Sequence, residues 1–460
     1  MGFTEFGDVT LNCPKAKTSA ILHYKALPPE QNQGLSSLQL VQVCGVDGAE
    51  RKEVVLSKNR DLLFQISSMQ SLTEEEVGSQ SLSQIPQGPY RDLLAKYPKL
   101  LEQNFKSEDP KNGIIHRIRT GTHPPTRAKA RKLLPGSPKA EGAWKAWKEL
   151  WDLGIVEPVD PNEPNTWSSP LHLAPKPGGG LRPVGDYRDL NTKTELDQYP
   201  LPDLRGHTHH MAGSKIFSKV DMRKAFHQIL IHKDDRKKTC VATPWGLFNF
   251  RRLSMGLSNS AQSFQRLIDS VLRGVSNCFV YLDDILVYNA DEDSHMKTLE
   301  EIFARLEKNG LTLALDKCEF GKESLDYLGY TVNAEGILPI KKKVTAIENF
   351  PVPIKQKQLL AFLGSLNFYR ASLPKTEPSE EYPQPRAPAE VLDPLYKLAT
   401  AKITNSSFKK EWDSNKKFQS AFDTAKKLLV NAVMINHPVP SAPLALTTDA
   451  SNYCLGAALD

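Results

Sequence analysis

The run CFVYLDDILVY, residues 278–288, constrains the fold of this chain more than any other segment. It places two adjacent carboxylates, Asp283 and Asp284, between two apolar stretches rich in β-forming residues. This pattern predicts a tight hairpin with the pair at or near its tip, although Asp-Asp is a poor turn dipeptide compared with Asn-Gly. Adjacent carboxylates repel each other, and apolar surroundings weaken their solvation. A chain that accepts both costs is easiest to understand if cations bind there.

Hard oxygen ligands of this kind select Mg²⁺ or Mn²⁺, which are commonly held by one or two carboxylates together with substrate phosphates. A third carboxylate, Asp221, lies where the alternating pattern of IFSKVDMRKAF passes from a strand into a helical turn. Two such ions can activate a hydroxyl nucleophile and stabilise the leaving group of an in-line displacement. Spacing alone does not place Asp221 beside the pair, because 62 residues separate it from Asp283. A helix N-cap is the alternative role for a lone Asp at a strand end.

Strands and helices interleave along the chain without a regular βαβ repeat, which predicts an α+β fold with helices on one side of an antiparallel sheet. The clearest helix, HMKTLEEIFARLEKNG at 295–310, aligns four apolar residues on one face and ends at Asn309-Gly310. The segment PLHLAPKPGGGLRPVGDYRDLN at 170–191 predicts a strand, a glycine turn and a second strand. The glycine run is not a phosphate loop, because no GxxxxGK[ST] frame surrounds it. An amphipathic helix is also expected within 408–433.

Composition excludes several classes of protein. The chain has 40% apolar and 24% charged residues, as ordinary globular proteins do, and no apolar run long enough to span a membrane. Its first residues lack the hydrophobic core of a signal peptide. The six cysteines form no CxxC pair, so neither a zinc ribbon nor a disulfide scaffold is indicated. We therefore expect an intracellular protein in a reducing compartment, with no membrane partner.

The net charge of +6 is unevenly distributed. Residues 111–140 contain eight Lys or Arg and no Asp or Glu, so the rest of the chain is nearly neutral. We call residues 111–140 the basic band. A solvated loop is one interpretation of it, and a phosphate-contacting arm of a nucleic-acid enzyme is the other.

Six segments in order complete the pattern: KPGGGLRPVGDYRDLN, FSKVDMRKAFHQI, GLFNFRRLSMGLSNSAQSFQRLID, FVYLDDILVY, GLTLALDKC and LDYLGYTV. Their series resembles the consecutive polymerase motifs of reverse transcriptases, most closely those of gypsy-type LTR retrotransposons, over about residues 90 to 460. The combination of motifs is specific, whereas any one motif alone is weak. The resemblance implies a Pol polyprotein fragment with a right-hand polymerase fold of fingers, palm and thumb around an antiparallel palm sheet.

By this resemblance the chain is an RNA-directed DNA polymerase that uses two Mg²⁺ or Mn²⁺ ions to add dNTPs to a primer 3′-end on an RNA or DNA template. Asp221, Asp283 and Asp284 carry over as the metal-binding carboxylates. Lys317 matches the lysine that protonates the departing pyrophosphate. The alternative is a domesticated or decayed element that binds nucleic acid without catalysis. Oligomeric state does not follow from the sequence.

Further contacts with substrate also carry over. Lys176 and Arg182 flank the glycine turn, where the family's finger hairpin closes over the incoming triphosphate. Phe226 matches the steric gate that excludes a 2′-hydroxyl, although a core Phe on a helix face is the plainer interpretation of that residue. Met255 and Gly256 match the loop that contacts the nascent base pair, where the family more often has Phe or Gln in place of Met255.

Leu328 and Gly329 match the primer grip, a hairpin whose close backbone approach favours glycine. Near the end of the chain, LALTTDASNYCLGAAL resembles the first two strands of a ribonuclease H domain, with Asp449 at the first metal-binding carboxylate. The sequence ends at Asp460, so we expect this RNase H start to be truncated and inactive. The resemblance also implies a location in the cytoplasm or in a virus-like particle.

Together these patterns predict seven segments. They are a poorly specified N-terminal segment with only short strands (1–85), an extension carrying the basic band (86–160), fingers and palm (161–340), thumb (341–373), a Pro-rich linker (374–390), connection helices (391–440) and the RNase H start (441–460).

Overall fold

The apolar run around the Asp pair forms the expected hairpin in the computed structural model of this chain. Strand β13 (Cys278–Tyr281) pairs antiparallel with β14 (Asp284–Asn289), and Tyr281 lies opposite Asp284. The two turn residues are therefore Leu282 and Asp283, and Asp284 is the first residue of β14. The second carboxylate thus enters the sheet.

The structure describes the backbone of four strands between residues 6 and 57, and residues 82 and 85–437 except 103–104, 107–110, 163–165, 177–178 and 379–382. It also describes the backbone of two strands between residues 446 and 459. The chain divides into two compact units, residues 1–86 and 87–460.

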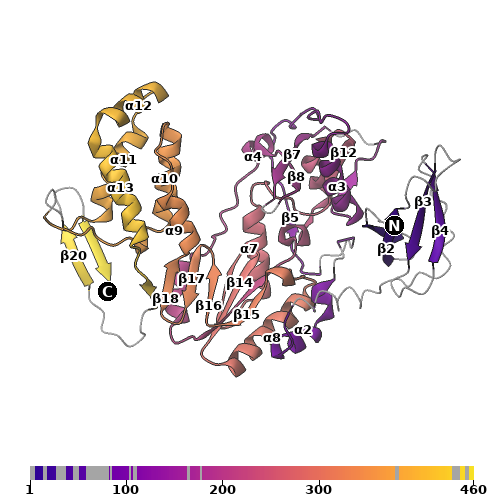
Figure 1. The fold of residues 1–460 in the computed structure, drawn as a ribbon, viewed down its shortest axis with the longest axis horizontal. Coiled ribbons are helices and arrows are strands. Elements are labelled where there is room, and N and C mark those ends of the chain that lie inside the picture. Colours follow the sequence, from indigo (N-terminus) through magenta and orange to yellow (C-terminus); the bar gives the residue numbers. More distant parts are fainter. Residues whose placement is uncertain are drawn as a thin grey trace, which may run out of the picture. The chain divides into compact units, whose positions relative to one another are not determined.

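The sheet that carries the Asp pair is antiparallel, with the strand order β13-β14-β9-β15. Strands β9 (Ile216–Asp221) and β15 (Glu319–Lys322) complete it. Helix α7 (Ser260–Val271) packs against β13 and α8 (Glu292–Lys308) against β14 (Figure 1). In α8 the four apolar residues of the predicted face are buried, and Asn309 caps the helix where its end was predicted. This arrangement confirms the α+β fold with an antiparallel palm sheet.

A second sheet has the strand order β6-β12-β11-β7-β8. Its strands are β6 (Val156–Pro158), β7 (Ser169–Pro175), β8 (Leu181–Gly185), β11 (Val241–Thr243) and β12 (Gly246–Phe250). Helix α3 (Pro138–Asp152) contacts this sheet because Trp147, which is fully buried, packs edge-on against Phe248 and Phe250. Strands β7 and β8 form the predicted glycine-tipped hairpin.

Short elements connect these sheets. They are α2 (Pro89–Ala95), β5 (Ile115–His116), α4 (Arg188–Lys193), α5 (Leu204–His207), η4 (Ala225–Gln228), β10 (Leu230–Ile231), α6 (Lys233–Arg236) and η6 (Leu315–Lys317). Strand β5, within the basic band, pairs in parallel with β10.

A third sheet, in the order β16-β17-β18-β19, supports the C-terminal helices. It contains β16 (Ser324–Tyr327), β17 (Tyr330–Asn333), β18 (Gly336–Pro339) and β19 (Ile435–Asn436). The helices are α9 (Lys341–Glu348), α10 (Gln356–Phe368), α11 (Pro388–Thr400), α12 (Asn405–Ser414) and α13 (Lys416–Val430). Side chains of the third sheet and of all five helices share one hydrophobic core. The segments expected as thumb and connection are therefore continuous in their packing (Figure 1).

Two sequence expectations differ from the structure in this region. The helix expected within 408–433 is two helices, α12 and α13, because the Asn415 side chain accepts a hydrogen bond from Lys417 N as the N-cap of α13. Helix α11 starts at Pro388, inside the expected linker, since proline is well suited to the first turn of a helix.

The N-terminal unit contains a four-stranded antiparallel sheet, β1 (Phe6–Cys13), β2 (Thr18–Ala26), β3 (Leu38–Cys44) and β4 (Arg51–Ser57), in sequential order. The expectation of only short strands was wrong. Strands β1 and β2 pair over eight consecutive residues, so their length is set by the ladder between them rather than by either segment alone. At the other end, β20 (Leu446–Ala450) and β21 (Leu455–Leu459) form the predicted pair of strands, which is antiparallel.

Candidate active site

Three carboxylates predicted as metal ligands meet at one end of the palm sheet. Strand β14 pairs with β9 so that Asp284 lies directly opposite Asp221. The carbonyl oxygen of Asp283 accepts a hydrogen bond of 3.0 Å from Met222 N, which fixes the turn against the end of β9. Residues that lie opposite each other in a ladder share one face of the sheet. The long-range pairing therefore brings Asp221 to the Asp pair, and Asp221 is not a helix N-cap.

The electrostatics of this cluster disfavour uncompensated negative charge. Burial raises the pKa of Asp221 to about 6, with further contributions from Asp284 and Asp283, against the lowering effect of Lys317. The ammonium of Lys317, on η6, lies 3.3 Å from Asp221 Oδ1. Burial also raises the pKa of Asp284, whose Oδ1 lies 3.7 Å from Lys219 Nζ. Two lysines thus supply the positive charge at this site.

Among the described residues, the side chains do not form a group of three or more His, Cys, Asp or Glu arranged to hold a metal ion. The donor chemistry nevertheless fits a divalent cation. Asp284 Oδ1 is buried without a hydrogen-bond partner, and like charges crowd Asp221. A cation would satisfy that oxygen and relieve the repulsion.

The turn between β13 and β14 is held by a residue that sequence reasoning missed. Leu282 has a φ of 54°, in the left-handed region that non-glycine residues rarely adopt. Its backbone N–H donates to Gln265 Oε1 at 2.8 Å, and Gln265 Nε2 donates to the carbonyl oxygen of Val280 at 3.1 Å. Gln265 lies on α7 and is fully buried. Gln265 lies within a segment of the family resemblance, but nothing in its local pattern indicated this role.

The glycine-tipped hairpin presents both predicted triphosphate contacts. Arg182 stands on β8, and its Nη1 lies 3.5 Å from the sulfur of Met255. Lys176 is exposed beside the turn, where its backbone N–H donates to the carbonyl oxygen of Gly180. The structure therefore brings Arg182 to the Met255–Gly256 loop and leaves the Lys176 side chain exposed to solvent.

The Met255–Gly256 loop is fixed by Asn191, the second residue that sequence reasoning missed. Asn191 Nδ2 donates to the carbonyl oxygen of Gly256 at 2.8 Å, and Asn191 Oδ1 accepts from Ser258 N at 2.8 Å. Gly256 has a φ of 86°, which suits glycine. Asn191 ends the recognised segment at 170–191, but nothing in its local pattern indicated this contact.

Phe226, the predicted steric gate, lies on η4 just after the end of β9. Its ring is half-buried and packs edge-to-face against Phe264, with 5.7 Å between ring centroids. The ring is thus held in place by the α7 core while part of it stays accessible. The buried part of the ring fits a packing role, and the accessible part leaves the role of a steric gate a prediction.

The predicted primer grip is the two-residue turn between β16 and β17. Leu328 and Gly329 have φ values of 46° and 89°, and Tyr327 pairs with Tyr330 across the turn. Two positive φ values in a two-residue turn are typical of the type I′ hairpin. The carbonyl oxygen of Gly329 accepts from Ile340 N at 3.2 Å, which links the turn to the start of α9.

The basic band is an extended segment fixed along the second sheet. Ser168 Oγ accepts from Ala128 N and donates to the carbonyl oxygen of Ala128, both at 2.9 Å. Arg131 forms an ion pair with Asp186, which holds the pKa of that carboxyl well below its usual range after the larger effect of Arg188. The band is therefore ordered by specific contacts, unlike a loop that only solvent surrounds. All eight of its Lys and Arg residues are exposed.

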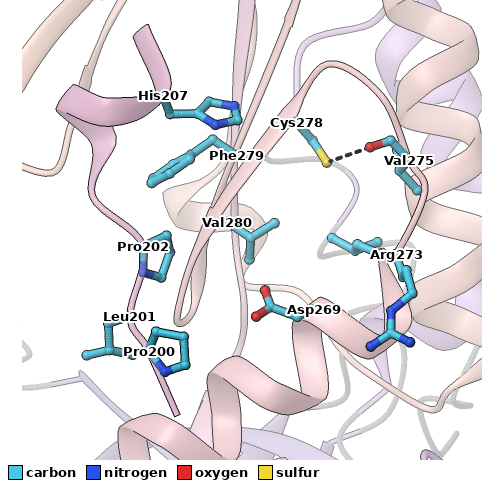
Figure 2. Close-up of a pocket in the computed structure, with 11 residues that line it drawn as sticks. Pro200, Leu201, Pro202, His207, Asp269, Arg273, Val275, Cys278, Phe279 and Val280 are labelled. Atoms are coloured by element: carbon cyan, nitrogen blue, oxygen red, sulfur yellow. Dashed lines mark hydrogen bonds between the residues drawn. The ribbon is translucent and has the colours of Figure 1, made fainter. Parts of the chain in front are cut away.

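A cavity lies apart from these groups, beside β13 and the C-terminal end of α7. Figure 2 shows Pro200, Pro202, His207 and Asp269 around it, with Phe279 and Val280 from β13. None of its lining residues is a predicted site residue. The candidate site is consequently the end of the palm sheet and not this cavity.

The side chain of Asp449, on β20, lies outside the described residues.

Two segments of the chain match known protein families. Residues 174–332 match the family described as reverse transcriptase (RNA-dependent DNA polymerase), and residues 412–460 match the RNase H-like domain found in reverse transcriptase. Residues 174–332 thus correspond to a reverse transcriptase domain, and RNase H-like sequence begins at residue 412. The second match begins within α12, before the expected start at residue 441.

Its relatives are Pol polyproteins of transposons. The retrovirus-related Pol polyprotein from transposon opus of Drosophila melanogaster is 34% identical over 375 residues, which cover 80% of this chain and 36% of that protein. The Pol polyprotein from transposon 297 of the same organism is 32% identical, covering 64% of this chain and 26% of that protein. The transposon Tf2-3 polyprotein of Schizosaccharomyces pombe is 29% identical and is covered to 20%. The chain thus spans about a third or less of these relatives, and the predicted resemblance to retrotransposon Pol proteins is confirmed.

Solved structures with a similar fold include the foamy viral protease-reverse transcriptase. Its complex with an RNA/DNA hybrid has a TM-score of 0.60 at 19% identity and covers 97% of this chain and 57% of that one. Its complex with dsDNA has a TM-score of 0.63 at 21% identity, covering 84% of this chain and 77% of that one. The reverse transcriptase fold is therefore confirmed.

Among the described helices, none has the length and apolar character needed to cross a membrane.

Proposed function

We propose that this chain is an RNA-directed DNA polymerase that extends a primer 3′-end with dNTPs by a two-metal mechanism. The observation that carries the proposal is the placement of Asp221 opposite Asp284 in the ladder, with Asp283 bonded through its backbone to Met222, inside a reverse transcriptase domain. Mg²⁺ or Mn²⁺ bound by these carboxylates would supply Lewis-acid stabilisation of the charge that develops in phosphoryl transfer.

The surrounding residues suit the remaining tasks of this reaction. Lys317, whose ammonium pairs with Asp221 at the carboxylate cluster, would give a proton to the departing pyrophosphate. Arg182 and Lys176, on the glycine-tipped hairpin, would bind the triphosphate of the incoming nucleotide, next to the Met255–Gly256 loop.

Two further features would position the polymer. The Leu328–Gly329 turn would contact the primer backbone, and the basic band would contact template phosphates through its exposed Lys and Arg side chains. The foamy viral enzyme of similar fold has been solved with an RNA/DNA hybrid and with dsDNA, which supports a template–primer duplex as the partner. We also propose, from the transposon relatives, that the protein acts in the cytoplasm or in a virus-like particle.

Primer extension on an RNA template tests the proposal. The Asp283→Asn variant should lower the extension rate by roughly a thousandfold, because it removes a charge from the cluster that holds the metal ions. The matched control is Asp326→Asn, which changes an Asp of the β16–β17 hairpin that bonds only to Thr331 among described contacts. Extension that survives Asp283→Asn would contradict the catalytic assignment. Retained duplex binding without extension by the unmodified chain would favour the non-catalytic alternative.

The proposed gate has its own test. Phe226→Val should raise the ratio of ribonucleotide to deoxynucleotide incorporation by about tenfold or more, because a smaller side chain leaves room for a 2′-hydroxyl. The ratio is measured in single-nucleotide extension with each sugar, and the deoxynucleotide rate of the same variant serves as its internal control. An unchanged ratio would show that Phe226 only fills space beside Phe264.

A further inference from the structure

Two hydroxyl groups join the Leu328–Gly329 turn to the end of helix α10 in a reciprocal way. Tyr330, on β17, donates its hydroxyl to the carbonyl oxygen of Phe368 at 3.1 Å. Tyr369, directly after α10, donates its hydroxyl to the carbonyl oxygen of Gly329 at 3.1 Å. Each tyrosine is thus bonded to the backbone of the other's segment. We call this pair of hydrogen bonds the tyrosine clasp.

The clasp is buried and tightly packed. Tyr330 and Tyr369 are 2% and 4% exposed, and their rings meet edge-to-face with 5.4 Å between centroids. The ring of Phe368 contacts both tyrosines. Both hydrogen bonds are partly shielded from solvent, which strengthens them relative to bonds at a fully exposed surface.

Glycine at position 329 is a condition for this contact. A Cβ there would lie 3.1 Å from Phe368 Cε1 and 3.2 Å from Tyr369 Oη, closer than side chains normally approach. The φ of 89° also suits glycine. The turn and the helix end are therefore fitted to each other through backbone as well as side-chain geometry.

We propose that Tyr330 and Tyr369 are positioning residues that hold the Leu328–Gly329 turn in register with α10. This inference rests on the proposed function, in which that turn contacts the primer. Besides the clasp, the bond from Ile340 N to Gly329 holds the turn, so the location of the turn follows the two helix ends to which it is bonded. Polymerisation needs the primer hydroxyl within about 3–3.5 Å of the attacked phosphorus. A displaced turn should consequently slow the chemical step and leave nucleotide binding unchanged.

The test uses the full chain bound to an RNA template and a DNA primer with 2-aminopurine at its 3′-end. Tyr369→Phe, Tyr330→Phe and the double variant each remove only hydroxyl groups. Thr331→Val is the control, because it removes a hydroxyl of the same hairpin that bonds to Asp326 and not to α10. Three quantities are measured: the single-turnover extension rate per active enzyme, the dNTP dissociation constant, and the fluorescence of the terminal base in the binary complex.

Each Phe variant should extend roughly fivefold more slowly, since a net hydrogen bond of this kind is modest and Gly329 keeps the bond from Ile340 N in both variants. The dNTP dissociation constant should stay within about twofold, and the terminal fluorescence should change. The double variant should be about as slow as the slower single variant, because both bonds secure one contact. Thr331→Val should match the unmodified chain in all three quantities.

Unmodified rates per active enzyme together with unmodified terminal fluorescence in both Phe variants would overturn the proposal. A lower melting temperature or active fraction, with the rate per active enzyme unchanged, would also overturn it, since a purely structural role predicts that result. Failure of the unmodified chain to extend any primer would instead count against the proposed function. In that case the fluorescence of the bound primer end still decides whether the clasp positions it.

Discussion

The β13–β14 hairpin and the β16–β17 hairpin use the same backbone device in two different settings. Each closes with a two-residue turn whose first residue is a leucine in the left-handed region, Leu282 with a φ of 54° and Leu328 with a φ of 46°. A non-glycine residue there costs on the order of 1 kcal/mol and persists only where its surroundings hold it. The two turns therefore depend on what surrounds them.

The surroundings differ in a way that matches the proposed tasks. The first turn is held from within the palm, because Leu282 N bonds to Gln265 of α7. The second turn is held by the segments that begin α9 and follow α10, through Ile340 and Tyr369. The turn that carries Asp283 is thus fixed to a helix that packs on its own sheet, whereas the Leu328–Gly329 turn is fixed to helix ends in the segment expected as thumb. A left-handed leucine thus opens a turn that is fixed within the palm in one place and a turn that is bonded to helix ends in the other.

Removing the palm anchor should have the largest effect on activity. Gln265→Met keeps the volume of the side chain but deletes the bonds to Leu282 N, Val280 O and Asp269 Oδ1. We expect extension to slow by about a hundredfold, since small displacements of catalytic groups have effects of that size. Single-turnover extension measures this. The control is Gln419→Met, which changes an exposed glutamine on α13. Equal rates for Gln265→Met and the unmodified chain would show that the first turn needs no anchor.

Acid should destabilise the palm before it affects the clasp. His295 is fully buried between Ser218 and Asn289, and burial lowers its pKa to about 4. Stability from the neutral imidazole is fully present above pH 6.5 and is lost as the pH falls towards 4. At pH 5 this loss amounts to about 2 kcal/mol. Tyr330, by contrast, has a pKa raised by burial to about 12 and does not titrate in this range.

The measurement is urea unfolding at pH 7 and pH 5 of the unmodified chain and of His295→Gln. The variant should lose about 2 kcal/mol less between the two pH values, because glutamine does not titrate. Other buried histidines titrate in both proteins, so the difference isolates His295. Identical losses would mean that His295 does not contribute to acid sensitivity.

The smallest expected effect comes from the second turn. Gly329→Ala adds a Cβ that meets Phe368 and Tyr369 in addition to the strain of a positive φ. We expect a loss of about 1–2 kcal/mol in the free energy of unfolding. Gly213→Ala is the control, because Gly213 has a φ of 79° and a Cβ added there would meet nothing within 4 Å among the described residues. If both variants lose the same amount, backbone strain alone explains the result and the fit to α10 contributes nothing.

Features that depend on local pattern could be predicted from the sequence. The hairpin around Asp283–Asp284, the glycine-tipped hairpin and helix α8 each follow from periodicity and turn chemistry within about twenty residues. The placement of Asp221 beside the pair could not be derived locally, because it depends on the register of β9 with β14. Only the resemblance to a family gave that expectation, and the roles of the site residues remain proposals.

Residues that anchor the turns were beyond prediction for a related reason. Gln265 resembles any other polar residue in its helix until β13 and β14 are folded against it. Tyr369 is an aromatic residue at a helix end, and its hydroxyl finds its acceptor only when folding brings Gly329 beside it. The four strands of the N-terminal unit were missed because their lengths are set by mutual pairing. In each case the contact that determines the structure joins two segments whose pairing cannot be seen in the local sequence pattern of either.

The basic band has a consequence for the thermodynamics of binding. Its buried residues His116, Ile118 and Thr120 alternate with the exposed Arg117 and Arg119, so the two guanidinium groups leave the same side of an extended backbone. Their Cα atoms are consequently about 6.6 Å apart along the chain. A disordered basic arm would lose about 1–2 kcal/mol of conformational freedom for each residue that it orders on a polyanion. In this protein, folding has already ordered the backbone of Arg117 and Arg119. A polyanion bound there would therefore gain electrostatic attraction with little further loss of backbone conformational entropy.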